Sequence, residues 1–239
     1  MVMQVDSSQQ FQARPFALGI DTCGPTGSVS LARINERESE TLGQIELEGR
    51  TYSATLFTAI EELLKRSGIT LKNIGCIVAV SGPGSFTGVR ISLSAAKGLS
   101  EGASIPVVAV SRLEVLALKA GVASAALDAH RHEVFLRIQT ASLPALELLA
   151  GAAEFASILP PPSQIAVCDD AAAALLASAW PQAELIRVLP PTAADAIELA
   201  VPRIRAAEFA DIALLDGHYL RRSDAEIFGE PTPAAVHPT

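Results

Sequence analysis

The sequence predicts an α/β fold in which mixed β-sheets are flanked by helices, and three features lead to this prediction. Short apolar segments typical of buried strands alternate with segments whose apolar residues recur every three or four positions, as in amphipathic helices. Breaks that contain glycine or proline separate these segments. Of the 239 residues, 49% are hydrophobic and 18% charged, which is enough to bury a substantial core. One large domain or two small lobes would fit.

The first half of the chain is predicted to run β-β-β-α-β-α-β-α. It opens with three antiparallel strands at 16–21, 28–34 and 41–47. The later elements are a helix over 52–66 with Gly68 as its C-cap, a strand over 76–81, a helix capped by Ser85 that runs to about 100, a strand over 107–110 and a helix from about 111. Such alternation indicates a mixed sheet with helices packed against it.

The second half restarts with strands and ends in an alanine-rich region. Strands are expected at 125–128 and 133–139, and helices at 169–178 and 192–207. The organisation we predict is a disordered tail over 1–14, a first lobe over 15–112, a second lobe over 113–228 and a disordered tail over 229–239. Whether the last helix packs back on the first lobe stays open.

Composition limits the classes of function. A formal net charge of -8 argues against a chain that grips a phosphate backbone alone, because such affinity depends on clustered Lys and Arg. The odd set Cys23, Cys76 and Cys168 is widely spaced and predicts small buried residues, with neither a disulfide framework nor a C-x-x-C metal site. No apolar run of membrane-spanning length and no signal-like start are evident, so a cytoplasmic location away from membranes is expected.

The most distinctive segment is SGPGSFTGVR, residues 81–90, with glycines at Gly82, Gly84 and Gly88. A glycine loop between a strand and a helix can cradle phosphate. The segment lacks the Gly-Lys-Ser/Thr ending of a Walker loop, and Thr87 replaces the last glycine of the dinucleotide pattern. The alternative is a structural turn that starts a packed helix, and the sequence is compatible with either a phosphate-binding loop or such a turn.

Small residues on the helix after this loop would let another helix approach closely. This predicts either a partner interface or tight packing within the chain. The candidate interface residues are Ser85, Phe86, Val89, Arg90, Ser92, Leu93, Ala96 and Lys97.

Three further groups of polar residues have both a functional and a structural interpretation. Asp21 and Thr22 could hold a metal-nucleotide as a vestigial site or could shape a turn. Asp128, His130 and His132 would share one face of an unbroken strand and could bind a metal, but a turn at Arg131 would make them a solvated edge. The segment 218–222 ends in a basic pair and could touch RNA or a partner, or simply lie on the surface.

Three segments together resemble the TsaB family of bacterial tRNA threonylcarbamoyladenosine biosynthesis proteins. They are LGIDTCGPTGSVSLAR at 18–33, the long segment VAVSGPGSFTGVRISLSAAKGLSEGASIPVVAVSRLEVLA at 78–117, and DAHRHEVF at 128–135. The resemblance implies a two-lobed, actin-like and ribonuclease-H-like fold. It departs from relatives at His130, where they carry arginine, so any function of that arginine is not carried over to this chain.

The resemblance also implies a division of labour within a complex. Relatives use the glycine loop and its helix as a subunit interface with a TsaD-like catalytic subunit, which acts with a TsaE-like ATPase to modify adenosine 37 of tRNA. The catalytic paralog carries a His-x-x-x-His metal pair where this chain has Arg112 and Leu116. The resemblance thus implies a non-catalytic subunit with no metal or cofactor of its own, ATP being used by the complex and tRNA bound mainly through it.

Three alternatives remain beside this interpretation. The chain could pair with a second copy when the partner is absent. An ATP-dependent, kinase-like phosphotransferase would use Asp21, Thr22 and the glycine loop. A metallopeptidase is disfavoured by the missing histidine pair.

Overall fold

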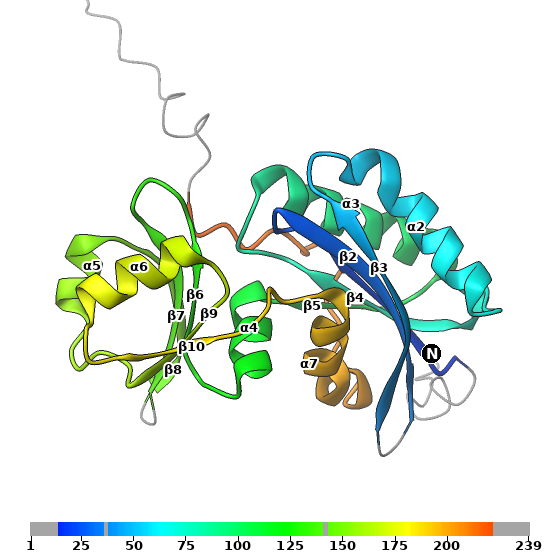
Figure 1. Cartoon of the computed structure of the whole chain (residues 1–239). Coiled ribbons are helices and arrows are strands. Elements are labelled where there is room, and N and C mark those ends of the chain that lie inside the picture. Colours follow the sequence, from blue (N-terminus) through cyan, green and yellow to red (C-terminus); the bar gives the residue numbers. More distant parts are fainter. Residues whose placement is uncertain (1–13, 36–37, 141–142, 222–239) are drawn as a thin grey trace, which may run out of the picture.

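The computed structural model describes residues 14–35, 38–140 and 143–221, which form two lobes, each built on a five-stranded sheet (Figure 1). The first sheet holds β1 (Phe16–Asp21), β2 (Thr26–Ile34), β3 (Ser39–Glu48), β4 (Ile74–Val80) and β5 (Val107–Val110). Its helices are α2 (Tyr52–Arg66), a 3-10 turn η1 (Leu71–Asn73), and α3 (Phe86–Ala103). The second sheet holds β6 (Ala125–Asp128), β7 (Val134–Thr140), β8 (Leu143–Ala150), β9 (Gln164–Val167) and β10 (Glu184–Arg187). The remaining helices are α4 (Arg112–Ala120), α5 (Ala152–Ser157), α6 (Asp170–Ala179) and α7 (Ala193–Arg205).

Both sheets have the same topology. The first has the order β3-β2-β1-β4-β5 and the second β8-β7-β6-β9-β10, so in each the first three strands are antiparallel and the last two run parallel to the first. The helices follow the strands in the same places, so both halves run β-β-β-α-β-α-β-α. The fold is thus an internal structural repeat.

The third helix of each half packs on the other half's sheet. Leu113 and Leu116 of α4 belong to a core cluster with Leu127 and Phe135 of the second sheet. Helix α7 packs against the first sheet, where its Ile197 is 1% exposed. Figure 1 shows α4 and α7 between the two sheets. This exchange ties the lobes together through buried apolar surface.

The burial of each strand matches its position in the sheet. All seven residues of β4 are buried, as expected of a parallel strand covered on both faces, and β3 at the edge is mostly exposed. Cys76 on β4 and Cys23 after β1 are buried free thiols, while Cys168 is partly buried. Burial raises the pKa of Cys76 to about 12 and raises that of Cys168.

The elements predicted for the first half are confirmed to within about three residues. Helix α2 has the predicted bounds, although its C-cap is Ser67 and Gly68 follows with φ of +65°. Five elements were not predicted: η1, β8, α5, β9 and β10. The predicted tails lie outside the described residues, apart from Arg14. Among the described helices, none is long and apolar enough to cross a membrane.

After α7 the chain continues without helix or strand through residues 206–221, here called the C-terminal strap. The amide of Ala210 donates to the carbonyl oxygen of Val107 on the edge strand β5 at 2.8 Å, and the amide of His218 donates to Ser81 at 2.7 Å. Arg221 then forms an ion pair with Glu133 and donates to the carbonyl oxygen of Ala129 at 2.7 Å. The strap therefore runs from the first lobe to the second (Figure 1).

Candidate partner-binding groove and the loop cluster beside it

The turn after β1 packs directly against the glycine loop after β4. Oγ1 of Thr22 donates to the carbonyl oxygen of Gly88 at 2.6 Å, and the amide of Ser85 donates to that of Cys23 at 2.8 Å. A Cβ atom at Gly88 would overlap the carbonyl oxygen of Thr22, and one at Gly84 would overlap that of Cys23. Glycine is therefore needed at both positions so that the chain's own backbone segments can approach each other.

Gly82 adopts a backbone conformation that side chains rarely take. Its φ is +111°, and its carbonyl oxygen accepts a hydrogen bond of 2.6 Å from the amide of Arg112 at the start of α4. All three glycines thus have structural roles, which favours a turn that starts a packed helix. A kinase-like function that uses this loop for phosphate is not favoured.

Asp21 shapes the turn and faces a buried arginine. Its Oδ1 accepts from the amide of Cys23 at 2.8 Å, and its Oδ2 lies 3.7 Å from Nε of Arg112. Both residues are buried, and Nε of Arg112 has no hydrogen-bond partner within the described ranges. The guanidinium supplies a counter-charge to the carboxylate from within the chain.

Leu116 is the other position at which the catalytic paralog carries a histidine of its metal pair. In this chain Leu116 is fully buried against the second sheet.

Tyr52 closes the turn from the side of α2. Its hydroxyl donates to the carbonyl oxygen of Gly24 at 2.8 Å. Burial, with a smaller contribution from the Asp21 carboxylate, raises the pKa of Tyr52 to about 12. Burial likewise raises the pKa of the Cys23 thiol well above its usual range. Both groups therefore stay neutral at physiological pH.

A carboxylate at the lobe junction was missed by the sequence analysis. Glu147 on β8 accepts from the hydroxyl of Ser111 at 2.7 Å and from Nη1 of Arg137 at 2.9 Å, and Nε2 of His218 lies 2.8 Å from it. Burial raises the pKa of Glu147, but its contacts with these three side chains outweigh burial and lower the pKa below 4.5. Glu147 therefore links the first lobe, the second lobe and the strap.

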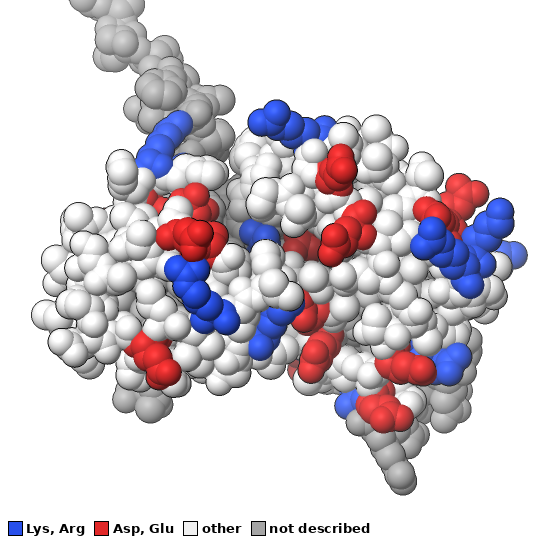
Figure 2. Space-filling view, in the orientation of Figure 1, with Lys and Arg blue, Asp and Glu red and all other residues white. Residues whose placement is uncertain are grey.

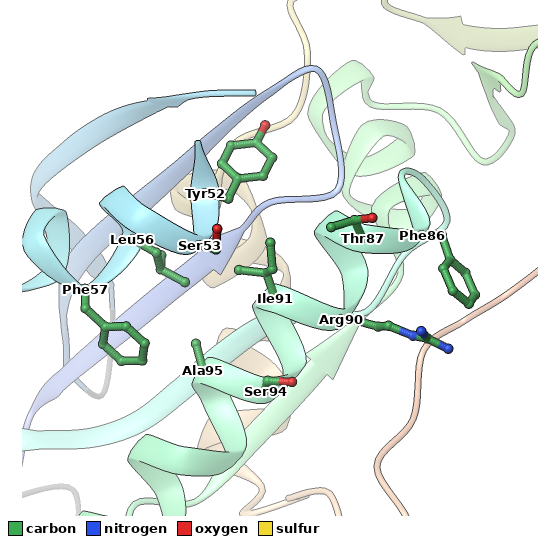
Figure 3. A pocket seen from close by; sticks show the side chains of 10 residues that line it. All are labelled: Tyr52, Ser53, Leu56, Phe57, Phe86, Thr87, Arg90, Ile91, Ser94 and Ala95. Atoms are coloured by element: carbon green, nitrogen blue, oxygen red, sulfur yellow. The ribbon is translucent and has the colours of Figure 1, made fainter. Parts of the chain in front are cut away.

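A groove with a cavity volume of about 430 Å³ runs between α2 and α3. Figure 3 shows Phe57 of α2 at one end, Phe86 and Arg90 of α3 at the other, and Ile91 and Ala95 between them. Phe57 is 55% exposed, so the groove has an exposed aromatic ring at this end. The remaining lining residues are Tyr52, Ser53, Leu56, Thr87 and Ser94.

The structure divides the predicted interface residues into two sets. Exposed or partly exposed are Ser85, Phe86, Arg90 and Lys97, whereas the others face the chain's own core: Val89, Ser92, Leu93 and Ala96. Ser92 is 0% exposed, and its hydroxyl donates to the carbonyl oxygen of Ile20 at 3.3 Å. Assigning these four residues to an exposed interface is contradicted by their burial, because this side of α3 packs on the chain's own first sheet.

The turn between β6 and β7 carries the histidines considered for metal binding. His130, Arg131 and His132 are exposed and have φ values of +60°, +57° and +62°, so the unbroken strand that would align them is wrong. Nδ1 of His130 instead lies 2.9 Å from Oδ2 of Asp128. Across residues 14–35, 38–140 and 143–221, no three His, Cys, Asp or Glu side chains converge as a metal site would require.

On the face in Figure 2, acidic and basic side chains are interspersed, without a continuous basic surface.

Comparison with known proteins finds sequences similar to this chain among tRNA-modification proteins. The family described as "TsaD: tRNA N6-adenosine threonylcarbamoyltransferase" matches residues 40–143. The tRNA threonylcarbamoyladenosine biosynthesis protein TsaB of Haemophilus influenzae is 35% identical over 124 residues, 49% of this chain and 51% of that protein. TsaB of Escherichia coli is also 35% identical, over 49% of this chain and 52% of that protein. The chain spans about half the length of the curated relatives it matches.

The solved structures extend the likeness over most of the chain. YeaZ from Pseudomonas aeruginosa has a TM-score of 0.68 at 25% identity and covers 86% of this chain and 99% of its own. A P. aeruginosa protein described as similar to peptidase YeaZ has a TM-score of 0.70 at 26% identity, with the same coverage. The chain therefore shares its two-lobed, actin-like α/β fold with these YeaZ structures. Its resemblance in sequence to TsaB is confirmed.

Proposed function

We propose that this chain is a non-catalytic subunit of a tRNA N6-threonylcarbamoyladenosine synthesis complex, in which it binds and supports a TsaD-like catalytic subunit. The observation that carries this proposal is the exposed groove between α2 and α3, which ends in Phe57 and in Phe86 with Arg90. Its aromatic and small side chains with one cation suit a protein helix. A TsaE-like ATPase, tRNA held mainly through the complex, and a cytoplasmic location complete the proposal.

The cluster formed by the turn at Asp21 and the glycine loop supports a non-catalytic role. The turn at Asp21 and the glycine loop are hydrogen-bonded to each other. The guanidinium of Arg112 provides the positive charge beside the Asp21 carboxylate that a bound cation would otherwise provide. Arginine cannot serve as a neutral ligand to a metal. We therefore propose that this subunit carries no cofactor and that ATP is consumed elsewhere in the complex.

The groove also explains how the chain could pair with itself. An exposed aromatic and a row of small residues favour close helix packing, and the same surface can meet a second copy when the partner is absent. Sedimentation of the chain alone and with the partner would then show a homodimer replaced by a heterodimer.

Reconstitution tests the proposal. The TsaD-like and TsaE-like subunits, tRNA, ATP and threonylcarbamoyl-adenylate are combined with and without this chain, and modified adenosine is measured. Ser94→Arg should block the groove and abolish both partner capture and product. Ser178→Arg, which adds the same side chain to an exposed serine of α6, is the matched control and should leave both unchanged. Equal product without the chain would refute the proposal.

A further inference from the structure

The C-terminal strap touches the groove through one aromatic side chain. The ring centroids of Tyr219 and Phe86 lie 4.9 Å apart, with the ring planes tilted by 44°. On the groove side, the guanidinium carbon of Arg90 lies 3.9 Å from the Phe86 ring centroid. Phe86 thus contacts both Tyr219 of the strap and Arg90, so that a series of contacts, Tyr219–Phe86–Arg90, leads from the strap to the end of the groove; Phe86 and Arg90 appear at this end in Figure 3.

The strap holds Tyr219 firmly on its own side. A Cβ atom at Gly217 would overlap the Tyr219 ring, so this ring lies between the backbone of Gly217 and Phe86. The adjacent His218 donates its amide to Ser81 in the first lobe, and its Nε2 lies 2.8 Å from Glu147 in the second. Tyr219 is therefore held between Gly217 and Phe86, next to a residue, His218, that contacts both lobes.

Arg90 is held against Phe86, and among the described residues no carboxylate neutralises its charge. Arg90 is exposed, and in the part of the chain that the structure describes no carboxylate lies within ion-pair distance of it. A guanidinium over an aromatic face keeps its N–H donors directed to the ring edge and outward, where they suit a planar carboxylate. An arginine fixed in this way loses little conformational entropy on binding.

We propose that Tyr219 is a positioning residue for the groove: through Phe86 it fixes Arg90 to receive a carboxylate of the partner subunit. The inference rests on the proposed function, since it concerns the same groove. It adds that the strap, and hence the junction of the lobes, controls how well the groove binds. Arg90 determines specificity for an acidic side chain, whereas Tyr219 does not touch the partner.

The test is a double-mutant cycle on the affinity for the TsaD-like subunit, measured by calorimetry. Removing the ring in Tyr219→Leu should weaken binding about threefold to tenfold, the cost of ordering one long side chain. Tyr219→Phe keeps the ring and should bind like the unaltered chain. In the Arg90→Ala background, Tyr219→Leu should have almost no further effect, because the residue that it positions is gone.

Salt dependence gives a second readout that a merely structural role would not change. Binding should weaken with added NaCl in the unaltered chain and clearly less so in Arg90→Ala. Thermal unfolding of each variant shows whether it is folded; if Tyr219→Leu unfolds, Tyr219→Met, which also lacks the ring and leaves every groove residue unchanged, replaces it. Additive effects of Tyr219→Leu and Arg90→Ala, or equal loss in Tyr219→Phe, would overturn the inference. No binding by the unaltered chain would instead overturn the proposed function.

Discussion

Nε of Arg112 lies 3.7 Å from Oδ2 of Asp21, and the two side chains are 7% and 1% exposed. The pair stands at the base of the turn after β1, where the guanidinium also fills the space beside Gly24. A buried charge is stable only when an opposite charge or hydrogen bonds compensate for lost hydration. Each of the two side chains therefore depends on the other to compensate for its buried charge.

Removing the arginine alone should be strongly destabilising. We expect Arg112→Met to lower the free energy of unfolding by about 3 to 5 kcal/mol, because the Asp21 carboxylate is left buried without its counter-charge. Adding Asp21→Asn should recover part of that loss. Urea denaturation of the two single variants and the double variant measures this, and costs that simply add would show that the pair does not interact.

Two glycines of α3 should respond oppositely to alanine. At Gly88 the new methyl group meets the carbonyl oxygen of Thr22, so we expect a loss of about 1 to 3 kcal/mol from overpacking. At Gly98 an added Cβ meets nothing within 4 Å, and alanine favours the helix by roughly 0.5 to 1 kcal/mol. Thermal unfolding should therefore show Gly88→Ala below and Gly98→Ala above the unaltered chain. A Gly88→Ala variant as stable as the unaltered chain would contradict the close approach of the loops.

The best predicted elements are those with strong local signals. Helix α2 repeats its apolar residues regularly, and Ser85 caps α3 by accepting from the amide of Gly88 at 3.3 Å. The missed strands β9 and β10 have only four residues each and pair with partners distant in the sequence. Strand β8 reads LPALELLA, in which adjacent leucines suit a helix as well as a strand. Their pairing is decided by tertiary contacts.

The site was only half predictable for a similar reason. Sequence placed small residues on α3, but could not tell which face meets the chain's own sheet. Phe57 offered a usable signal, because it falls one position after Leu56 and so lies off the buried face of α2. Glu147 gave no local signal, since Ser111, Arg137 and His218 meet it only in the folded chain.

The orientation of α3 can be tested with lysine at two nearby serines. Ser92→Lys places a charge where the side chain is fully buried against β1, so we expect a loss of at least about 3 kcal/mol or failure to fold. Ser94→Lys lies on the exposed groove side and should change stability by no more than about 0.5 kcal/mol. Circular dichroism and urea denaturation distinguish them. A stable Ser92→Lys variant would show that this face of α3 is accessible.

Glu147 should make the stability of the chain depend on acidic pH. Because its pKa is lowered in the folded state, the carboxylate stabilises the fold fully above its unfolded value near 4.5, and this contribution is lost as pH falls through the lower folded value. Glu147→Gln should cost about 2 kcal/mol at pH 7, since the hydrogen bonds to a charged acceptor weaken, and much less at pH 3.

The measurement is urea denaturation of the unaltered chain and Glu147→Gln between pH 7 and pH 3. The two stabilities should converge below pH 4.5, because protonation removes in the unaltered chain the charge that the variant already lacks. Glu61→Gln, at an exposed position of α2, controls for general acid sensitivity and should parallel the unaltered chain at every pH. A constant difference between the unaltered chain and Glu147→Gln across this range would mean that the junction is held by packing of α4 and α7, with no contribution from the charge of Glu147.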